Sequence, residues 1–201
     1  MKKIIAQGAE SIICLNKSIT KKRIKKSYRI PQIDQKIRKK STKTETKLLQ
    51  KAFSLIPTPK LLSSKDTTIK MEYIKGKLIK DILNSSKIKQ QLCKQIGQQI
   101  SLLHKNNIIH GDLTTSNMIL KNNKIYFIDY GLSFISQKTE DKAVDLYLLK
   151  QALKAKNYKH PNLFNIILRS YNNKEVIERL KKVEQRGRYK RKKFRQPQNW
   201  L

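Results

Sequence analysis

Two polar side chains have the types and the spacing to bind a divalent cation, and a third could act on a phosphate group beside it. Asp112 and Asn117 lie in a polar loop between short apolar runs, and Asp129 follows the apolar run Ile125–Ile128. Two strands joined by a turn form a hairpin, which would bring Asn117 and Asp129 together. Amide and carboxylate oxygens suit Mg²⁺, and Asp112 could then orient a hydroxyl or a water for attack on a phosphoryl group. The simpler alternative is a hairpin in which these residues only form turns.

The two motifs resemble the catalytic loop and the metal-binding loop of the protein-kinase superfamily, where they read H-R-D-x-x-x-x-N and D-F-G. Here the sequence has HGD at 110–112, with Asn117 five residues after the aspartate, and DYG at 129–131. Either motif alone leaves the simple hairpin open, but the pair, with 17 residues from one aspartate to the other, favours a phosphotransferase. The resemblance implies ATP and Mg²⁺ as cofactors. It also implies an α+β, reduced two-lobed kinase-like fold, with an antiparallel sheet in the first lobe and helices in the second.

The net charge is large and positive, because 46 Lys and Arg against 14 Asp and Glu give +32 over 201 residues. This excess predicts attraction to a polyanion, with nucleic acid first and a membrane surface second. A coding bias toward Lys, Ile and Asn is the alternative, with part of the charge on a passive, solvated face. Cys14 and Cys93 fit neither a disulfide framework nor a metal-ligand spacing, and no apolar run reaches the length of a membrane span. A cytoplasmic protein without a membrane segment is therefore expected.

One strand and one helix are expected to hold the phosphates of a nucleotide. Lys21 ends a predicted strand at 18–21, and Glu45 lies in a helix that begins near Thr42, while a separate helix is expected after Pro31. A phosphotransferase needs a lysine against the nucleotide phosphates and a helix carboxylate that holds it there. Lys21 and Glu45 are the candidates for this pair.

The residues around this strand and helix are similar to the small atypical kinase of the KEOPS complex, which makes threonylcarbamoyladenosine in the tRNA of archaea and eukaryotes. QGAE at 7–10 matches its short phosphate loop, and YRIP at 28–31 matches its tyrosine-arginine-x-proline segment. STKTE at 41–45 matches its arginine-threonine-x-x-glutamate helix start, except that Ser41 replaces the arginine. The resemblance implies an ATPase or weak serine/threonine kinase. It also implies the threonylcarbamoyl-transferase subunit, other KEOPS subunits and tRNA as partners.

Three alternatives to this function remain. A RIO-like kinase and a small-molecule phosphotransferase also place glycine before the loop aspartate, but DYG at 129–131 and YRIP at 28–31 speak against both. A tRNA-binding scaffold with a vestigial nucleotide site is the third. Against this third alternative, all five polar residues expected of a working nucleotide site are present. They are Lys21, Glu45, Asp112, Asn117 and Asp129.

The resemblance also assigns residues that the spacing alone does not. Gly8 takes the place of the glycine-rich phosphate loop, and the backbone groups of Glu72 and Ile74 would bond the edge of adenine. The lobes would meet at about Gly76, which gives a first lobe of residues 1–75 and a second of 76–185.

The second lobe is predicted to be built on a helix through Ile88–Leu103, where apolar residues recur at helical spacing. His104 is expected to cap this helix, and His110 is expected to brace the catalytic loop. Asp145 resembles the kinase aspartate that pins that loop, a structural role. Because only thirteen residues separate Gly131 from Asp145, the peptide-docking segment of protein kinases is missing or minimal.

The last segment, 186–201, is a basic run interleaved with aromatic residues and follows a closing helix at 174–184. Repeated like charges predict an extended tail unless a polyanion neutralises them. A helix ending in a solvated tail is the alternative, and contact with RNA phosphates is favoured. The predicted tRNA-binding residues are Arg186, Arg188, Lys190, Arg191, Lys192, Lys193 and Arg195.

Overall fold

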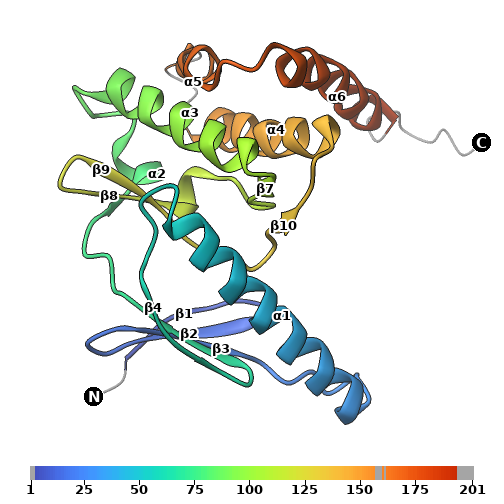
Figure 1. The fold of residues 1–201 in the computed structure, drawn as a ribbon. Helices are drawn as coiled ribbons and strands as arrows, with labels where there is room; N and C mark the ends of the chain where they lie inside the picture. Colours follow the sequence, from blue (N-terminus) through green and yellow to red (C-terminus); the bar gives the residue numbers. More distant parts are fainter. Residues whose placement is uncertain (1–2, 157–159, 161, 194–201) are drawn as a thin grey trace, which may run out of the picture.

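The computed structural model describes the backbone of residues 3–156, 160 and 162–193, and the side chains of these except 156 and 187–193. Figure 1 shows an antiparallel sheet with one long helix in the N-terminal part and a group of helices in the C-terminal part. The predicted two-lobed arrangement is confirmed. None of the described helices has the length and apolar content to span a bilayer.

The N-terminal sheet has five strands in the order β1-β2-β3-β5-β4, with every neighbouring pair antiparallel. Its central strand β3 places Lys21 opposite Ile13 of β2 and Ile69 of β5. Because side chains alternate along a strand, Lys21 and Arg23 point to the same face of the sheet, and both bond Glu45 of the long helix. The strands are β1 (Lys3–Gln7), β2 (Ser11–Leu15), β3 (Ile19–Arg23), β4 (Leu61–Lys65) and β5 (Thr68–Met71).

Helix α1 (Pro31–Phe53) is continuous, so the prediction of two helices in this region was wrong. Proline is tolerated at the first helical position, and no glycine or second proline interrupts the following residues. The hydroxyls of Thr42 and Thr46 donate to the carbonyls of Arg38 and Thr42, each at 2.8 Å, so these side chains bond within the helix instead of ending it.

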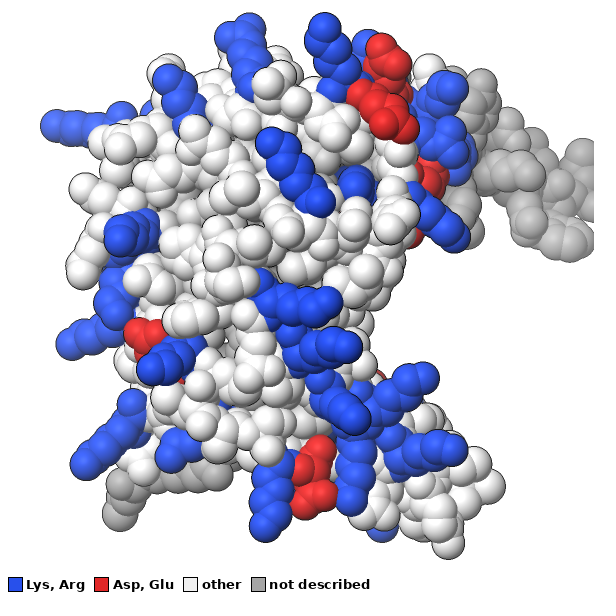
Figure 2. Space-filling model, viewed as in Figure 1, with Lys and Arg blue, Asp and Glu red and all other residues white. Residues whose placement is uncertain are grey.

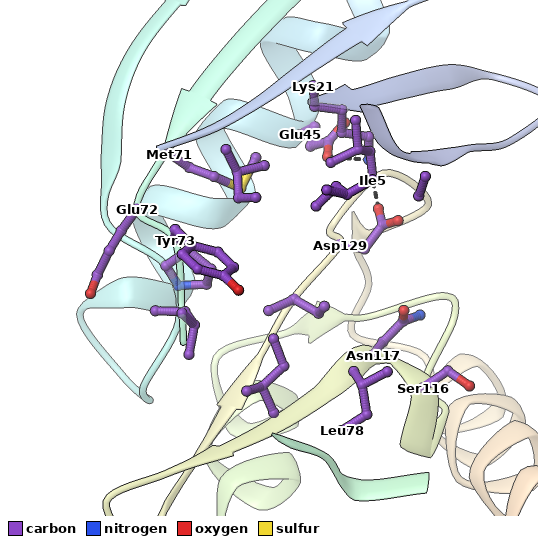
Figure 3. Close-up of a pocket in the computed structure, with 17 residues that line it drawn as sticks. Ile5, Lys21, Glu45, Met71, Glu72, Tyr73, Leu78, Ser116, Asn117 and Asp129 are labelled. Atoms are coloured by element: carbon purple, nitrogen blue, oxygen red, sulfur yellow. Dashed lines mark hydrogen bonds and ion pairs between the residues drawn. The ribbon is translucent and has the colours of Figure 1, made fainter. Parts of the chain in front are cut away.

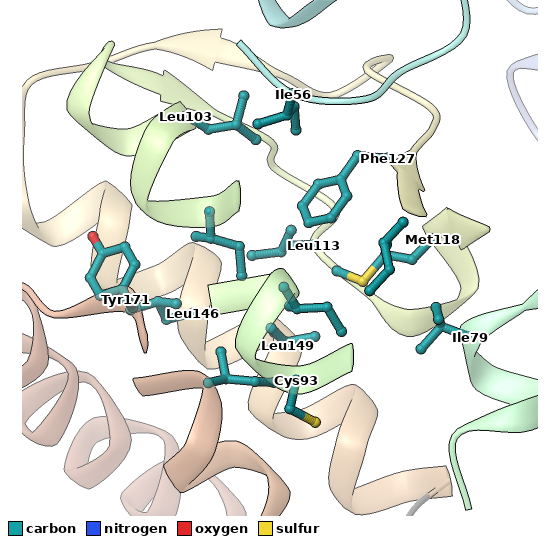
Figure 4. Packing of buried hydrophobic residues seen from close by; sticks show 14 of the residues in the cluster. Ile56, Ile79, Cys93, Leu103, Leu113, Met118, Phe127, Leu146, Leu149 and Tyr171 are labelled. Atoms are coloured by element: carbon teal, nitrogen blue, oxygen red, sulfur yellow. The ribbon is translucent and has the colours of Figure 1, made fainter. Parts of the chain in front are cut away.

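The C-terminal part is organised around α3 (Lys89–Lys105), as the apolar spacing predicted. Its buried face carries Leu92, Ile96, Ile100 and Leu103, all at most 1% exposed. Figure 4 shows neighbouring members of this core, among them Leu103, Leu146 and Tyr171. The other elements are β6 (Lys77–Leu78), α2 (Ile79–Ile82), β7 (Ile108–Ile109), η1 (Thr115–Asn117), β8 (Met118–Lys121), β9 (Lys124–Phe127), β10 (Phe134–Ile135), α4 (Thr139–Lys156), α5 (Leu163–Tyr171) and α6 (Lys174–Lys193).

The predicted hairpin is formed by β8 and β9, which pair from Met118–Phe127 to Lys121–Lys124. Its two turn residues, Asn122 and Asn123, have φ angles of 50° and 58°, the left-handed backbone that a two-residue hairpin turn requires. The other end of the hairpin places the Asn117 carbonyl 3.0 Å from the Ile128 amide. The loops before β8 and after β9 therefore leave the hairpin side by side.

Helix α6 continues through residue 193, so the expectation that the basic segment is extended from 186 was wrong for residues 186–193. Two observations account for the helix. Val176, Leu180 and Val183 are buried at helical spacing, and Glu140 of α4 accepts ion pairs from Arg179 and Arg186. Lysine and arginine are also good helix formers, so their repulsion does not end the helix. Residues 194–201 lie outside the described part.

Candidate active site

A cavity of about 330 Å³ lies between the N-terminal sheet and the β8–β9 hairpin. Figure 3 shows Ile5, Lys21 and Met71 on the sheet side, and Asn117 and Asp129 on the hairpin side. Its walls combine aliphatic side chains with one lysine, carboxylates and an amide. This is the composition of a site for a ligand with a flat apolar part and a charged part.

Lys21 occupies the charged end of the cavity, and two carboxylates from distant segments hold it. Its Nζ donates to Glu45 Oε1 of α1 and to Asp129 Oδ1 after β9, at 2.7 Å each. The other oxygen of Glu45 accepts from the Arg23 guanidinium at 2.6 Å. Two cations and two carboxylates therefore form a charge-balanced group, called here the Lys21 cluster.

The pKa values of Lys21 and Asp129 follow from burial and pairing. Burial lowers the pKa of Lys21, but the Glu45 and Asp129 carboxylates more than offset it, so the net pKa is raised. For Asp129 burial raises the pKa, and the Lys21 ammonium reverses this, so the net pKa is below its usual value. The raised pKa of Lys21 and the lowered pKa of Asp129 keep both groups charged at neutral pH.

Asp129 is the most exposed carboxylate of the cluster, with 42% of its side chain exposed against 3% for Glu45. Its Oδ1 accepts from Lys21 Nζ and from the Gly131 amide at 3.1 Å. Its Oδ2 accepts no hydrogen bond from the described part of the chain. A Cβ at residue 131 would lie 3.0 Å from Asp129 Oδ1 and 3.2 Å from Lys21 Nζ, so glycine there keeps the two groups in contact.

Asp112 and Asn117 are held together across the loop. The Asn117 amide nitrogen donates to the Asp112 carbonyl and to Asp112 Oδ2, at 2.9 Å each. Because both hydrogen bonds use the nitrogen, the amide oxygen remains available, and Figure 3 shows it on the side of Asp129. Asn117 lines the cavity, whereas Asp112 does not.

The loop that carries Asp112 is fixed by the buried carboxylate of Asp145, which is 1% exposed. Its oxygens accept from the amides of His110 at 2.8 Å and Gly111 at 3.0 Å. The His104 ring lies between this carboxylate and the Tyr171 hydroxyl, with Nε2 3.2 Å from Asp145 Oδ2 and Nδ1 2.9 Å from the hydroxyl. These groups are called here the Asp145 cluster.

The structure tests the predictions for two histidines, His104 on α3 and His110 in the catalytic loop. His104 does not cap α3, because the C-cap is Asn106 and the His104 ring is buried in the Asp145 cluster. His110 does brace the loop, with Nε2 3.1 Å from the Ile128 carbonyl. Gly111 adopts φ 78°, and a Cβ there would lie 2.3 Å from the Leu132 carbonyl oxygen, so the arginine that protein kinases carry at this position does not fit.

The sequence and the fold agree with known kinases. A family model for the RIO domain matches residues 15–150. The KEOPS complex subunit Bud32 of Pyrococcus abyssi is 39% identical over 96% of this chain and 98% of that protein. The chain belongs to the Bud32 family.

Two further matches show a fused relative and the kinase fold. A Methanobrevibacter smithii protein described as a probable bifunctional tRNA threonylcarbamoyladenosine biosynthesis protein is 40% identical over 92% of this Bud32-family chain and 36% of its own length. The Rio2 kinase–ADP/Mg²⁺–phosphoaspartate complex of Chaetomium thermophilum superposes with a TM-score of 0.65 at 13% identity. That match covers 92% of this chain and 70% of the other. The RIO-domain match also shows that a RIO-like kinase was not a separate alternative, because this Bud32-family chain carries that domain.

Of the other residues predicted to contact the nucleotide, two line the cavity in this Bud32-family chain and one does not. Glu72 and Ile74 line the cavity, and the Glu72 amide donates to the Lys60 carbonyl at 2.8 Å. Gly8 does not line it. The Gly8 amide donates to the Ser11 carbonyl at 3.0 Å in the β1–β2 turn, and a Cβ at residue 8 would meet nothing within 4 Å.

The predicted tRNA-binding residues lie on α6 and beyond it. Only Arg186 has a described side chain, which is 60% exposed and pairs with Glu140 at 2.9 Å. The α6 backbone carries the next five of them, and Arg195 lies outside the described residues. The five are Arg188, Lys190, Arg191, Lys192 and Lys193.

Sequence reasoning missed Arg23, the second cation on Glu45. The signal was available, because a residue two positions after Lys21 on a strand points to the same face. It also missed Tyr171 as a partner of His104, for which the sequence offers no local signal.

Proposed function

We propose that this chain is an ATP-dependent atypical serine/threonine kinase and ATPase that works as a KEOPS subunit in threonylcarbamoyladenosine formation in tRNA. The observation that carries the proposal is the Lys21 cluster at one end of the inter-lobe cavity, with Asp129 exposed toward the space. The names of the Pyrococcus abyssi and Methanobrevibacter smithii relatives support the biological setting.

The residues divide between the two parts of ATP. Lys21 steadies the phosphates and Glu45 orients Lys21. The carbonyl of Glu72 and the amide of Ile74 bond the adenine edge, because the Glu72 amide is already used by Lys60. Gly8 leaves open space beside the β1–β2 turn, where the phosphates would pass.

Asn117 and Asp129 fit Mg²⁺, since the free Oδ2 of Asp129 and the amide oxygen of Asn117 are hard oxygen donors on one side of the cavity. Within the described residues no three His, Cys, Asp or Glu side chains gather as a metal site. This suits an ion that takes few protein ligands and completes its coordination with phosphates and water. When bound, such an ion neutralises charge on the phosphates. Asp112 lies beside Asn117 and positions the acceptor hydroxyl or water.

The acceptor side favours ATP hydrolysis over peptide phosphorylation. Between Gly131 and the start of α4 the chain forms only the short strand β10, which pairs with β7. This leaves little room for a peptide-docking segment. Thr114 stands where many protein kinases carry a lysine, so one preorganised partner for the transferring phosphoryl group is absent.

We propose that the lobes meet at about Gly76, between the end of β5 and the start of β6. The first lobe is then residues 1–75 and the second is residues 76–185. It also includes the threonylcarbamoyl-transferase subunit and tRNA as partners and a cytoplasmic location. RNA contact by 186–201 is retained as part of the proposal.

The test is ATP hydrolysis by the purified chain, alone and with the threonylcarbamoyl-transferase subunit and tRNA, in parallel with threonylcarbamoyladenosine formation on that tRNA. We expect hydrolysis that depends on Mg²⁺ and on the partners, together with modified tRNA. Phosphorylation of free aminoglycosides at a higher rate would instead identify a small-molecule phosphotransferase. Modified tRNA without ATP turnover by this chain would identify a scaffold.

A further inference from the structure

Five lysines form one exposed face of α1, on the side opposite to the Lys21 cluster. Their spacings of four, three, four and four residues keep them within about 80° of the helix circumference and spread them over about 22 Å. The five are Lys36, Lys40, Lys43, Lys47 and Lys51, called here the α1 lysine face.

No carboxylate neutralises this face within the described part of the chain. The ion pairs of α1 are made by Asp34, Arg38, Lys39 and Glu45, and the five lysines take part in none. Figure 2 shows lysine and arginine side chains in a band over α1, from the middle of the molecule to its lower right. Like charges three and four residues apart repel, so this face destabilises the helix until an anion binds it.

Composition alone does not account for the α1 lysine face. Helix α3 belongs to the same lysine-rich chain and is also half exposed, yet its outer positions carry Gln90, Gln91 and Gln98 beside two lysines. On α1 the exposed positions from 36 to 51 are mostly lysine, and the acidic residues of the helix, Asp34 and Glu45, are buried. The lysines are concentrated on one surface of one element.

We propose that the α1 lysine face binds the phosphate backbone of RNA. A nucleic-acid strand presents a charge about every 3.4 Å of axis in a B-form duplex, so 22 Å of lysines meets several phosphates in one row. The face offers flexible ammonium groups and no aromatic ring for stacking. Binding is therefore electrostatic and independent of base sequence. The choice of RNA over other polyanions rests on the tRNA partner of the proposed function.

A membrane surface fits this helix less well. An interfacial helix inserts an apolar face into the lipid, but the apolar face of α1, with Leu48, Leu49 and Ala52, is buried in the protein. The exposed large apolar residues of α1 lie only at its two ends, with Ile33 and Ile37 in the first turns and Phe53 as the last residue. The α1 lysine face therefore offers charge along its length without an apolar anchor.

The test is binding of a fluorescein-labelled tRNA transcript, and of an RNA duplex of unrelated sequence, to the full chain by fluorescence anisotropy at several salt concentrations. Three variants each remove four positive charges, so they share one net charge. The first changes the α1 face to glutamine: Lys36, Lys40, Lys43 and Lys47. The control changes exposed lysines of the helical lobe: Lys87, Lys94, Lys105 and Lys154. The third changes the end of α6: Lys190, Arg191, Lys192 and Lys193.

We expect the α1 variant to bind both RNAs at least about 10-fold more weakly than the control. Its plot of log affinity against log salt should be shallower by about 3, because each lost phosphate contact contributes roughly 0.7–0.9. The same four positions changed to arginine should restore affinity and slope. Circular dichroism on each variant reports whether α1 is still folded.

Equal weakening by the α1 and control variants would overturn the inference, because only net charge would then matter. Weaker RNA binding in the α6 variant alone would place the RNA contact at the end of α6 and not on the α1 lysine face. Loss of binding to phosphatidylserine vesicles, with RNA binding retained, would identify a membrane face. None of these results touches the proposed ATP site, whose failure would appear as absent ATP hydrolysis in the wild-type chain with its RNA affinity intact.

Discussion

The Lys21 cluster and the Asp145 cluster are both built on buried polar groups, but they are closed in different ways. Glu45 and Asp129 hold two cations, and Asp129 keeps one oxygen free and 42% of its side chain exposed to the cavity. Asp145 instead accepts two backbone amides and faces His104, with 1% of the residue exposed.

This difference in exposure and in hydrogen-bond partners indicates which of the two carboxylates, Asp129 or Asp145, can bind a ligand. An exposed carboxylate in a balanced ion-pair group can exchange a partner for a metal or a phosphate without leaving a buried charge alone. A buried carboxylate that satisfies backbone amides cannot, because those amides would lose their only partner and remain desolvated. We therefore assign chemistry to Asp129 and loop positioning to Asp145.

The largest expected effect is on ATP hydrolysis in Asp129→Asn. Asparagine tolerates the left-handed backbone at this position, φ 63°, so the change removes the charge and keeps the loop. We expect kcat to fall by roughly 10²–10³, as when one preorganised charge-stabilising group is lost. The melting temperature should stay within about 3 °C of wild type, because Asp129 itself is 42% exposed and Lys21 keeps its ion pair with Glu45.

Asp66→Asn is the matched control for this change. Asp66 also has a left-handed backbone, φ 51°, and pairs with a lysine at 2.9 Å, but it is exposed on the β4–β5 turn. It should leave ATP hydrolysis unchanged. Normal ATP hydrolysis in Asp129→Asn would show that the Asp129 carboxylate does not take part in the chemistry.

The next effect is on folding, in Asp145→Ala. The change removes the acceptor of the buried His110 amide, of the part-buried Gly111 amide and of the His104 ring, and it should lower the free energy of unfolding by about 3 kcal/mol. For a chain of this size the melting temperature should fall by roughly 6–12 °C. Thermal unfolding followed by circular dichroism measures it.

Asp141→Ala, on the same helix and bonded to one part-buried serine hydroxyl, is the control, and it should change stability by under about 1 kcal/mol. Equal melting temperatures for the two variants would remove the distinction between the clusters.

The smallest effect is a pH dependence of stability that arises from Asp129 in the Lys21 cluster. Because the pKa of Asp129 is lower in the folded chain than in the unfolded one, the charged carboxylate stabilises the fold above its unfolded pKa of about 3.9. That contribution is lost as the pH falls through the folded pKa. The difference in stability between wild type and Asp129→Asn should therefore shrink below about pH 4. A difference that is constant from pH 7 to pH 3 would contradict the lowered pKa.

The sequence predicted the site best where one short segment contains the whole signal. The HGD and DYG motifs, the asparagine turn at 122–123 and the apolar spacing of α3 each depend on neighbours within a few residues, and the fold agrees with them. It predicted poorly where packing overrides local preference. Thr42 bonds within α1 instead of starting a helix, and Glu140 of α4 helps α6 continue past residue 186.

By itself the sequence determined the residue types of the site and the hairpin that brings its two loops together. Only the tertiary structure decided that Lys21, among so many lysines, meets Glu45 and Asp129, which lie 24 and 108 residues away in the chain. The physical reason is that turns and periodic faces arise from local backbone geometry. An ion pair depends on a distance of a few ångströms between elements, which sheet register and helix packing alone set.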